Sequence, residues 1–253
     1  MRPLPAYYSR LAPFEPLFAT GAPILTYHKL GPRPRHARLK GLYVSQRLFA
    51  RQMAELAEAG FTTPSLTDLF AAGGPSARAI GLTFDDGFRN VLTFGLEPLA
   101  RHRFRAIQFL VAGLLGRTNE WDRPIGERME PLMDASEVRE WLAAGHAIGS
   151  HTLKHPRLTE LSAAAAREEI IASKKRLEDT FGIAIEHFCY PYGDWNEAVR
   201  DLVAEAGYRT ACTTEFGVNA ADANRLALRR ITARYPSRNL KTWLARFGIG
   251  ASR

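Results

Sequence analysis

The chain has 253 residues, of which 46% are hydrophobic and 24% are charged, a composition typical of a globular protein with an ample core. Its length is within the range of one α/β barrel. Lysine and arginine outnumber aspartate and glutamate by 34 to 26, and the formal net charge of +8 favours acidic partners such as anionic glycans, lipid phosphates or membrane surfaces. Nucleic acid is not expected as a partner, because no RNA-binding fingerprint, zinc finger or recognition-helix pattern is evident.

Short apolar runs alternate with amphipathic segments along the chain. Residues 1–20 are rich in proline and predict an irregular arm, and residues 21–253 predict a single domain. In chain order, strands are predicted at residues 22–28, 79–84, 106–111, 147–151, 186–190, 208–214 and 226–232. Helices are predicted at residues 45–60, 65–74, 88–101, 135–144, 158–181, 195–206 and 239–247. Strands that alternate with helices imply a mainly parallel sheet, and without a Gly-rich phosphate loop we expect this sheet to close into a barrel.

Two loops are candidates for the surroundings of a site. Residues 31–40 are basic and contain two prolines, so they predict a loop, which is either solvated or lines a substrate groove. Residues 116–131 predict a surface loop over the barrel mouth. Its Trp121 either stacks on a sugar ring or, as is commoner, pins its own loop.

Cysteine usage and the N-terminal residues bear on location. Only Cys189 and Cys212 are present, far apart in the sequence, so a disulfide framework is not expected. The first 20 residues lack the continuous apolar core of a secretory signal. No window approaches the ~20 apolar residues needed to span a bilayer. We therefore expect a cytoplasmic protein with no transmembrane segment.

Polar side chains interrupt two of the predicted strands at their ends. The strand at 79–84 stops at Asp85 and Asp86, and the strand at 147–151 runs into His151 and His155. Buried carboxylates are costly unless they are paired or bind a metal, although an Asp-Gly turn at a strand end is the simpler explanation of the first cluster alone. Imidazole nitrogens and carboxylate oxygens together are the usual ligands of a catalytic zinc.

Three motifs in order resemble those of one family. They are TFDDG at residues 83–87, HTLKHP at 151–156 and FCYPYG at 188–193. Together they resemble the motif series of the polysaccharide deacetylases, also called the NodB-homology family or carbohydrate esterase family 4. The flanking segments fit as well, so the resemblance covers most of the chain. It implies the distorted (β/α)7 barrel of these deacetylases.

The resemblance also implies a division of roles at the site. Asp86, His151 and His155 match the metal-binding set of the family, with Zn²⁺ as the expected divalent metal. Asp85 corresponds to the general base, and the backbone N–H of Tyr192 to a donor for the oxyanion. Pro156 disfavours helical backbone at His155, so the two histidines are expected on a loop or tight turn.

Two positions differ from the commonest family pattern. Most relatives carry the histidine that serves as general acid near the C-terminus, whereas here no histidine follows His187. One branch of the family, which includes the poly-N-acetylglucosamine deacetylases, looks circularly permuted. In that branch the general-acid histidine comes from an N-terminal strand that ends in Tyr-His, and His28 fits this arrangement. Many relatives carry arginine at the position of Cys189, where it orients the base. Arg230 is the candidate to hold Asp85 instead, and an ordinary surface arginine is the equal alternative.

The resulting hypothesis is a metal-dependent hydrolase that removes N-acetyl groups from an amino sugar of a polysaccharide, oligosaccharide or glycolipid. One alternative is a deformylase or another C–N hydrolase acting on a lipid-linked amino sugar. A second is an inactive carbohydrate-binding module that keeps the metal. The presence of both Asp85 and Asp86 argues against the inactive module. The sequence leaves open the sugar, its length and the oligomeric state.

Overall fold

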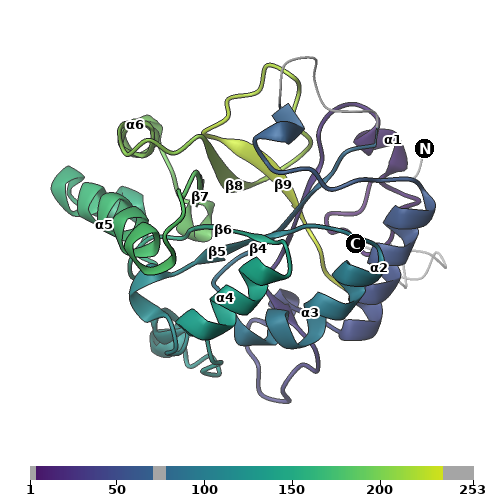
Figure 1. Cartoon of the computed structure of the whole chain (residues 1–253), viewed down its shortest axis with the longest axis horizontal. Coiled ribbons are helices and arrows are strands. Elements are labelled where there is room, and N and C mark those ends of the chain that lie inside the picture. Colours follow the sequence, from purple (N-terminus) through teal and green to yellow (C-terminus); the bar gives the residue numbers. More distant parts are fainter. Residues whose placement is uncertain (1–3, 71–77, 236–253) are drawn as a thin grey trace, which may run out of the picture.

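Seven parallel strands form a closed barrel in the computed structural model, which describes residues 4–70 and 78–235 (Figure 1). The strands are hydrogen-bonded in the order β1-β4-β5-β6-β7-β8-β9, and β9 pairs back with β1. Their bounds are β1 Ile24–Tyr27, β4 Gly81–Phe84, β5 Ile107–Leu110, β6 Ala147–Ser150, β7 His187–Cys189, β8 Thr210–Phe216 and β9 Leu228–Thr232. A separate parallel pair is formed by β2 Lys29–Leu30 and β3 Tyr43–Val44. The predicted (β/α)7 barrel is confirmed.

Helices cover the outside of the barrel (Figure 1). They are α1 Glu15–Phe18, α2 Gln46–Glu58, α3 Arg89–Arg101, α4 Ala135–Ala143, α5 Ala163–Phe181 and α6 Glu197–Glu205. Local sequence explains where several of them begin. The Ser45 side chain accepts from the N–H of Leu48 to cap α2, and Asp134 caps α4 in a capping box with Glu137.

Side chains of each strand alternate between the barrel interior and the helix layer, as the period of a strand requires. In β5, Ile107 and Phe109 belong to the interior cluster, while Leu110 belongs to the larger cluster outside. Both faces of β1, β4 and β5 are therefore buried along their whole length, as expected for parallel strands covered by helices. The inward position of β9 carries Arg230, which is 1% exposed.

Some predicted boundaries were wrong. The helix predicted from residue 158 begins at Ala163, because Ser162 accepts from the N–H of Ala165 and caps it; residues 158–160 form a separate 3-10 turn. The helix predicted at 65–74 is only a 3-10 turn at Asp68–Phe70, and the remainder of that prediction from residue 71 lies outside the described residues. The terminal helix predicted at 239–247 also lies outside them.

The N-terminal arm is more ordered than the prediction of an irregular segment. Tyr8 donates its N–H to the carbonyl of Thr232, and Tyr8, Phe14 and Phe18 are buried and in ring contact with one another. These contacts attach the arm to β9 and to the outer core. The division of the chain at residue 20 stays a prediction.

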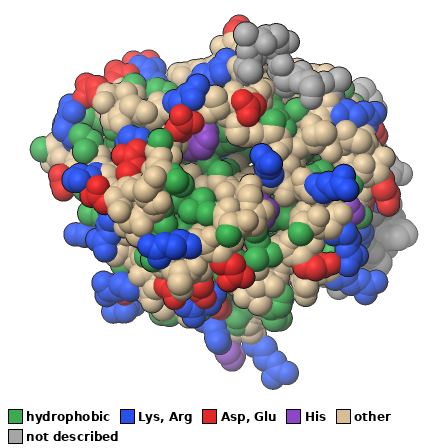
Figure 2. Space-filling view, in the orientation of Figure 1, with side chains coloured by type: hydrophobic (Ala, Val, Ile, Leu, Met, Phe, Trp, Pro, Cys, Tyr) green, Lys and Arg blue, Asp and Glu red, His purple; other side chains and the backbone are tan. Residues whose placement is uncertain are grey.

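Charges of both signs are mixed on one face of the molecule (Figure 2), and both cysteines are buried. On the face shown in Figure 2, lysine and arginine side chains are interspersed with aspartate and glutamate instead of forming one basic patch. Cys189 and Cys212 are register partners in β7 and β8, and both are free and buried. In the part of the chain that the structure describes, no helix has the length and apolar character needed to cross a membrane.

Stability should depend on the buried His187. The side chain is 7% exposed, and burial lowers its pKa to about 4. The unfolded chain then binds more protons between pH 6.5 and 4, so stability is present above pH 6.5 and is lost as the pH falls towards 4. We expect His187→Gln to reduce the stability lost over this range by about 3 kcal/mol, as measured by chemical denaturation, while His146, whose pKa burial also lowers to about 4, keeps its own contribution. His36→Gln, at an exposed loop position, should keep the wild-type pH dependence, and the same slope in His187→Gln would contradict the prediction.

Candidate metal and catalytic site

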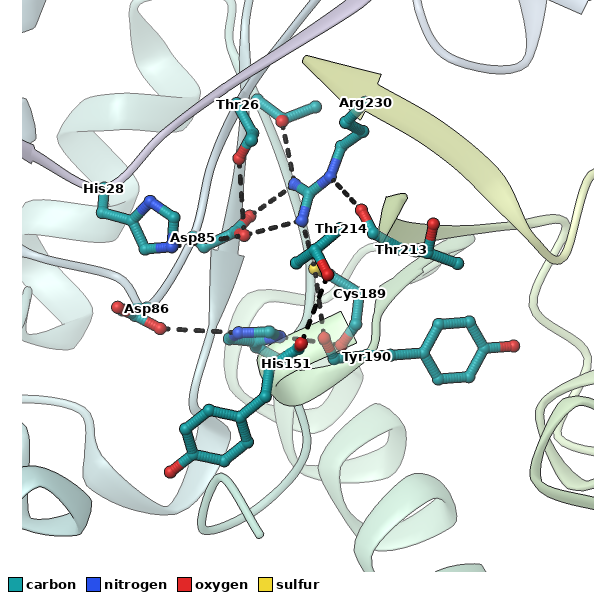
Figure 3. A network of polar contacts seen from close by, with 12 residues as sticks. Thr26, His28, Asp85, Asp86, His151, Cys189, Tyr190, Thr213, Thr214 and Arg230 are labelled. Carbon is teal, nitrogen blue, oxygen red and sulfur yellow. Dashed lines mark hydrogen bonds and ion pairs between the residues drawn. The ribbon is translucent and has the colours of Figure 1, made fainter. Parts of the chain in front are cut away.

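The motif residues converge at the carboxyl ends of the barrel strands. His28 follows β1, Asp85 and Asp86 follow β4, and His151 follows β6. Because all seven strands are parallel, these ends meet at one mouth of the barrel. Figure 3 shows His28, Asp85, Asp86 and His151 side by side, with Arg230 reaching Asp85 from β9.

Asp86, His151 and His155 form a compact group of potential metal ligands. The Asp86 Oδ1 atom lies 3.4 Å from Nε2 of His151 and 3.3 Å from Nε2 of His155. Two ligands bound tetrahedrally to zinc at 2.0–2.1 Å would be about 3.3–3.4 Å apart. All three residues are at most 5% exposed. The donor set and its spacing therefore fit a divalent metal.

Hydrogen bonds outside this group hold the ring of His151 and the backbone of His155. Nδ1 of His151 lies 2.7 Å from the carbonyl of Cys189, which leaves Nε2 facing Asp86. The backbone N–H of His155 donates to Thr152 Oγ1 at 2.9 Å. Between them, the backbone N–H groups of Leu153 and Lys154 both donate to Glu169 Oε2 at 2.9 Å. Sequence reasoning missed Glu169, because it belongs to the regular pattern of α5 and to no motif.

The backbone of the site is strained at several positions. Among the described residues, five that are not glycine have positive φ, and four of them lie here: Asp86, Thr152, His155 and Tyr192, with φ from 61° to 76°. Left-handed backbone is unfavourable for such residues and clusters at functional sites. The expectation that His155 is not helical is met, with φ of 65°.

Arg230 forms a bidentate ion pair with Asp85 through both terminal nitrogens of its guanidinium. Nη1 and Nη2 donate to Oδ1 and Oδ2 of Asp85, each at 2.7 Å. Further bonds run to Thr83 Oγ1, to the Thr213 carbonyl and to Cys189 Sγ, the last at 3.1 Å. Of the two placements considered for Arg230, the surface one is excluded. Burial alone would raise the pKa of Asp85, but the charge and hydrogen bonds of Arg230 outweigh it and lower that pKa.

His28 lies next to the same carboxylate. Its Nε2 is 3.7 Å from Asp85 Oδ2, and its side chain is 18% exposed. Burial lowers the pKa of His28, and the attraction of Asp85 and Asp86 offsets only part of that effect. The imidazole thus lies beside the carboxylate, where burial opposes its protonated form and the charges of Asp85 and Asp86 favour it.

A second group of possible ligands consists of Asp85, His151 and Cys189. It fits a metal less well, since Arg230 already occupies both oxygens of Asp85 and donates to the sulfur. Burial also raises the pKa of the Cys189 thiol to about 11, whereas a metal binds the thiolate. Cys189 is therefore a buried neighbour of the site.

Two aromatic side chains flank His155. Trp121 stacks on it with ring centroids 4.5 Å apart, and Tyr192 meets it edge-on at 4.6 Å. This contact attaches the loop 116–131 to His155, and stacking of Trp121 on a sugar ring stays a prediction. Tyr192 is 42% exposed, and the Cζ atom of Arg157 lies 4.3 Å from the centroid of its ring.

The basic loop 31–40 lies beside this region. Arg33 lines a surface cavity of about 380 Å³ together with Tyr43, Asn90 and Arg128. The Leu39 N–H donates to Glu127 of the loop 116–131. The two loops are therefore joined, and the predicted groove lining stays a prediction.

Comparison with known proteins places the chain in a family. A family model described as polysaccharide deacetylase matches residues 72–211. The putative polysaccharide deacetylase YxkH of Bacillus subtilis is 25% identical over 213 residues, which cover 83% of this chain and 70% of that protein. The chain spans about half the length of the rhizobial chitooligosaccharide deacetylases that it also matches. The chain belongs to the polysaccharide deacetylase family.

Solved structures share the fold. The Streptococcus pyogenes deacetylase PplD, in complex with acetate, superposes with a TM-score of 0.73 and 22% identity, covering 88% of this chain and 96% of that one. IcaB from Ammonifex degensii gives a TM-score of 0.72 and 22% identity, covering 91% of this chain and 98% of that one. These similarities agree with the (β/α)7 barrel.

Removing the guanidinium of Arg230 should destabilise the fold. Arg230→Met leaves the buried carboxylate of Asp85 unpaired, and losing one partner of a buried ion pair costs about 3–5 kcal/mol. Adding Asp85→Asn should recover part of the loss, because the unpaired charge is then gone. The neighbouring Arg229, whose side chain is 57% exposed and 3.6 Å from Glu215, is the matched control. Chemical denaturation of Arg229→Met should stay within about 0.5 kcal/mol of wild type, and equal losses for the two arginines would refute the role of the buried pair.

Proposed function

We propose that this chain is a metal-dependent hydrolase that removes N-acetyl groups from amino sugars of a polysaccharide, oligosaccharide or glycolipid. The observation that carries the proposal is the pair of adjacent carboxylates with separate partners. Asp86 faces His151 and His155 at 3.4 and 3.3 Å, while Asp85 is held by Arg230. One carboxylate is thus available to a metal and the other to a proton.

Asp86, His151 and His155 would hold the metal, with Zn²⁺ the first candidate because of its preference for nitrogen and carboxylate ligands. A bound divalent ion supplies Lewis acidity, which makes water a better nucleophile and polarises the carbonyl of the acetamide. Three protein ligands are the usual number in catalytic zinc sites, which keep one position open. The spacing of these residues supports that assignment.

Asp85 serves as the general base in this proposal. It takes the proton from the attacking water while Arg230 keeps the carboxylate ionised and fixes the direction of its oxygens. The low pKa of Asp85 ensures that it is free to accept a proton at neutral pH. Arg230 acts through Asp85 and is therefore a positioning residue.

His28 serves as the general acid, and Tyr192 as an oxyanion donor. An amine leaves an amide only with a proton, and His28 lies within 3.7 Å of Asp85, close enough for the two to serve the same reacting group. The backbone N–H of Tyr192 would donate to the oxyanion that forms on the carbonyl. Both assignments come from the family resemblance and are supported by the position of each residue at the barrel mouth.

The same site chemistry would serve a deformylase or another C–N hydrolase on a lipid-linked amino sugar. An inactive binding module fits less well, because it would have no need for a base whose geometry is fixed by a buried arginine. Names of relatives, such as chitooligosaccharide deacetylase and peptidoglycan-N-acetylglucosamine deacetylase, support an N-acetylated glycan as the substrate.

Acetate release is the direct test. Metal-stripped and zinc-reloaded protein would be assayed on N-acetylglucosamine oligomers and on acetylated and formylated lipid-linked amino sugars. We expect activity only after reloading. Asp85→Asn should abolish activity with metal still bound, and His28→Ala should lower kcat by about 10²-fold or more.

Three controls separate the parts of the proposal. Asp86→Asn should lose zinc as well as activity, measured by metal analysis after dialysis. Activity indifferent to His28→Ala would remove the acid assignment alone. Zinc binding and sugar retention without any product would identify a binding module.

A further inference from the structure

Lys29 is a fully buried lysine next to the proposed general acid. The residue is 0% exposed, and within the described part of the chain its Nζ has no hydrogen-bond partner. Burying an unpaired ammonium is costly. A side chain of similar shape without charge would pack there at least as well. The charge therefore needs partners other than hydrogen-bond acceptors.

Two aromatic rings surround the ammonium. Nζ lies 4.5 Å from the centroid of Phe88 and 4.9 Å from the centroid of Tyr43, distances typical of cation–π attraction. Both rings are themselves buried. The carboxylates of Asp122 and Glu127 also attract the ammonium from a longer range.

The positions of these rings in the chain connect the catalytic strand ends. Lys29 follows His28 directly, and Phe88 comes two residues after Asp86. Phe88 in turn lies 6.5 Å from Trp121, which stacks on His155 at 4.5 Å. One continuous series of cation and ring contacts thus joins the segment of His28 to the segments of Asp86 and His155.

We propose that Lys29 is a positioning residue for deacetylation: its cation–π contact with Phe88 holds His28 in register with the carboxylates of β4. The inference rests on the proposed function of His28 as general acid. Lys29 touches neither the reacting group nor the ligands of the metal, and acts through the backbone that it shares with His28. Removing its charge should displace the acid while leaving the fold intact.

Lys29→Met tests this, since methionine keeps most of the length and loses the charge. We expect an unchanged or higher melting temperature, unchanged zinc content and a kcat on the N-acetyl sugar lowered about 10-fold or more, as small displacements of a catalytic group allow. An activated acetyl ester, whose leaving group needs no proton, should be hydrolysed almost as fast as by wild type. Phe88→Leu should give the same selective loss.

The controls separate positioning from general damage. Lys174→Met removes another lysine over an aromatic ring, 4.9 Å from Tyr208 and on the outer helix α5, and should leave both activities unchanged. In a His28→Ala background, Lys29→Met should cost nothing further. Equal loss of amide and ester hydrolysis, or amide activity within twofold of wild type for both Lys29→Met and Phe88→Leu, would overturn the proposal.

A readout independent of activity decides whether a failure belongs to the proposed function. The chain has seven histidines, so the ring of His28 can be assigned in an NMR spectrum of labelled histidine from its absence in His28→Ala. Lys29→Met should shift this signal, and Lys174→Met should not. A shifted signal supports positioning even if His28 is shown to have no part in catalysis, while an unshifted one contradicts it.

Discussion

A buried guanidinium and a buried carboxylate, those of Arg230 and Asp85, form the contact on which the rest of the site depends. Asp85 stands at the end of β4, and Arg230 comes from β9, the strand that closes the barrel against β1. Each charge would be costly inside the barrel without the other. Closure of the barrel therefore keeps the proposed base ionised in its buried position. The last strand, β9, supplies the positive charge that pairs with the carboxylate at the end of β4.

Much of the fold was predictable, because its elements have strong local signals. Most of the strands are short buried runs, and Ser45 and Gly182 mark the start of α2 and the end of α5. Errors arose where two signals competed. The run after residue 158 looks helical throughout, and the interruption before α5 follows from the cap at Ser162. The short turn at 68–70 has the composition of a helix, but it forms no more than a 3-10 turn in the described residues.

The site was predictable as far as the motifs reach. Asp85, Asp86, His151 and His155 are close in sequence to the strand ends that position them, whereas Arg230 is 145 positions from Asp85 and had a surface alternative that only the three-dimensional structure removes. Glu169 and Lys29 could not be found, because Glu169 belongs to an ordinary helix and Lys29 is, in the sequence, one more charge beside a basic loop. The left-handed backbone at Asp86 and His155 likewise has no residue signature, since neither position is glycine.

Cys189 has a consequence for how such sites diverge. Its carbonyl oxygen is hydrogen-bonded to Nδ1 of His151, and its sulfur accepts a hydrogen bond from Nη2 of Arg230 at 3.1 Å. The residue is completely buried. An arginine at position 189 would bring a second guanidinium to the space beside Asp85 that the Arg230 guanidinium already fills, and two cations would then share one carboxylate. The two positions are mutually exclusive sources of the same charge. Moving the guanidinium from position 230 to position 189 would therefore require both substitutions together, because either one alone leaves two guanidinium groups or none beside Asp85.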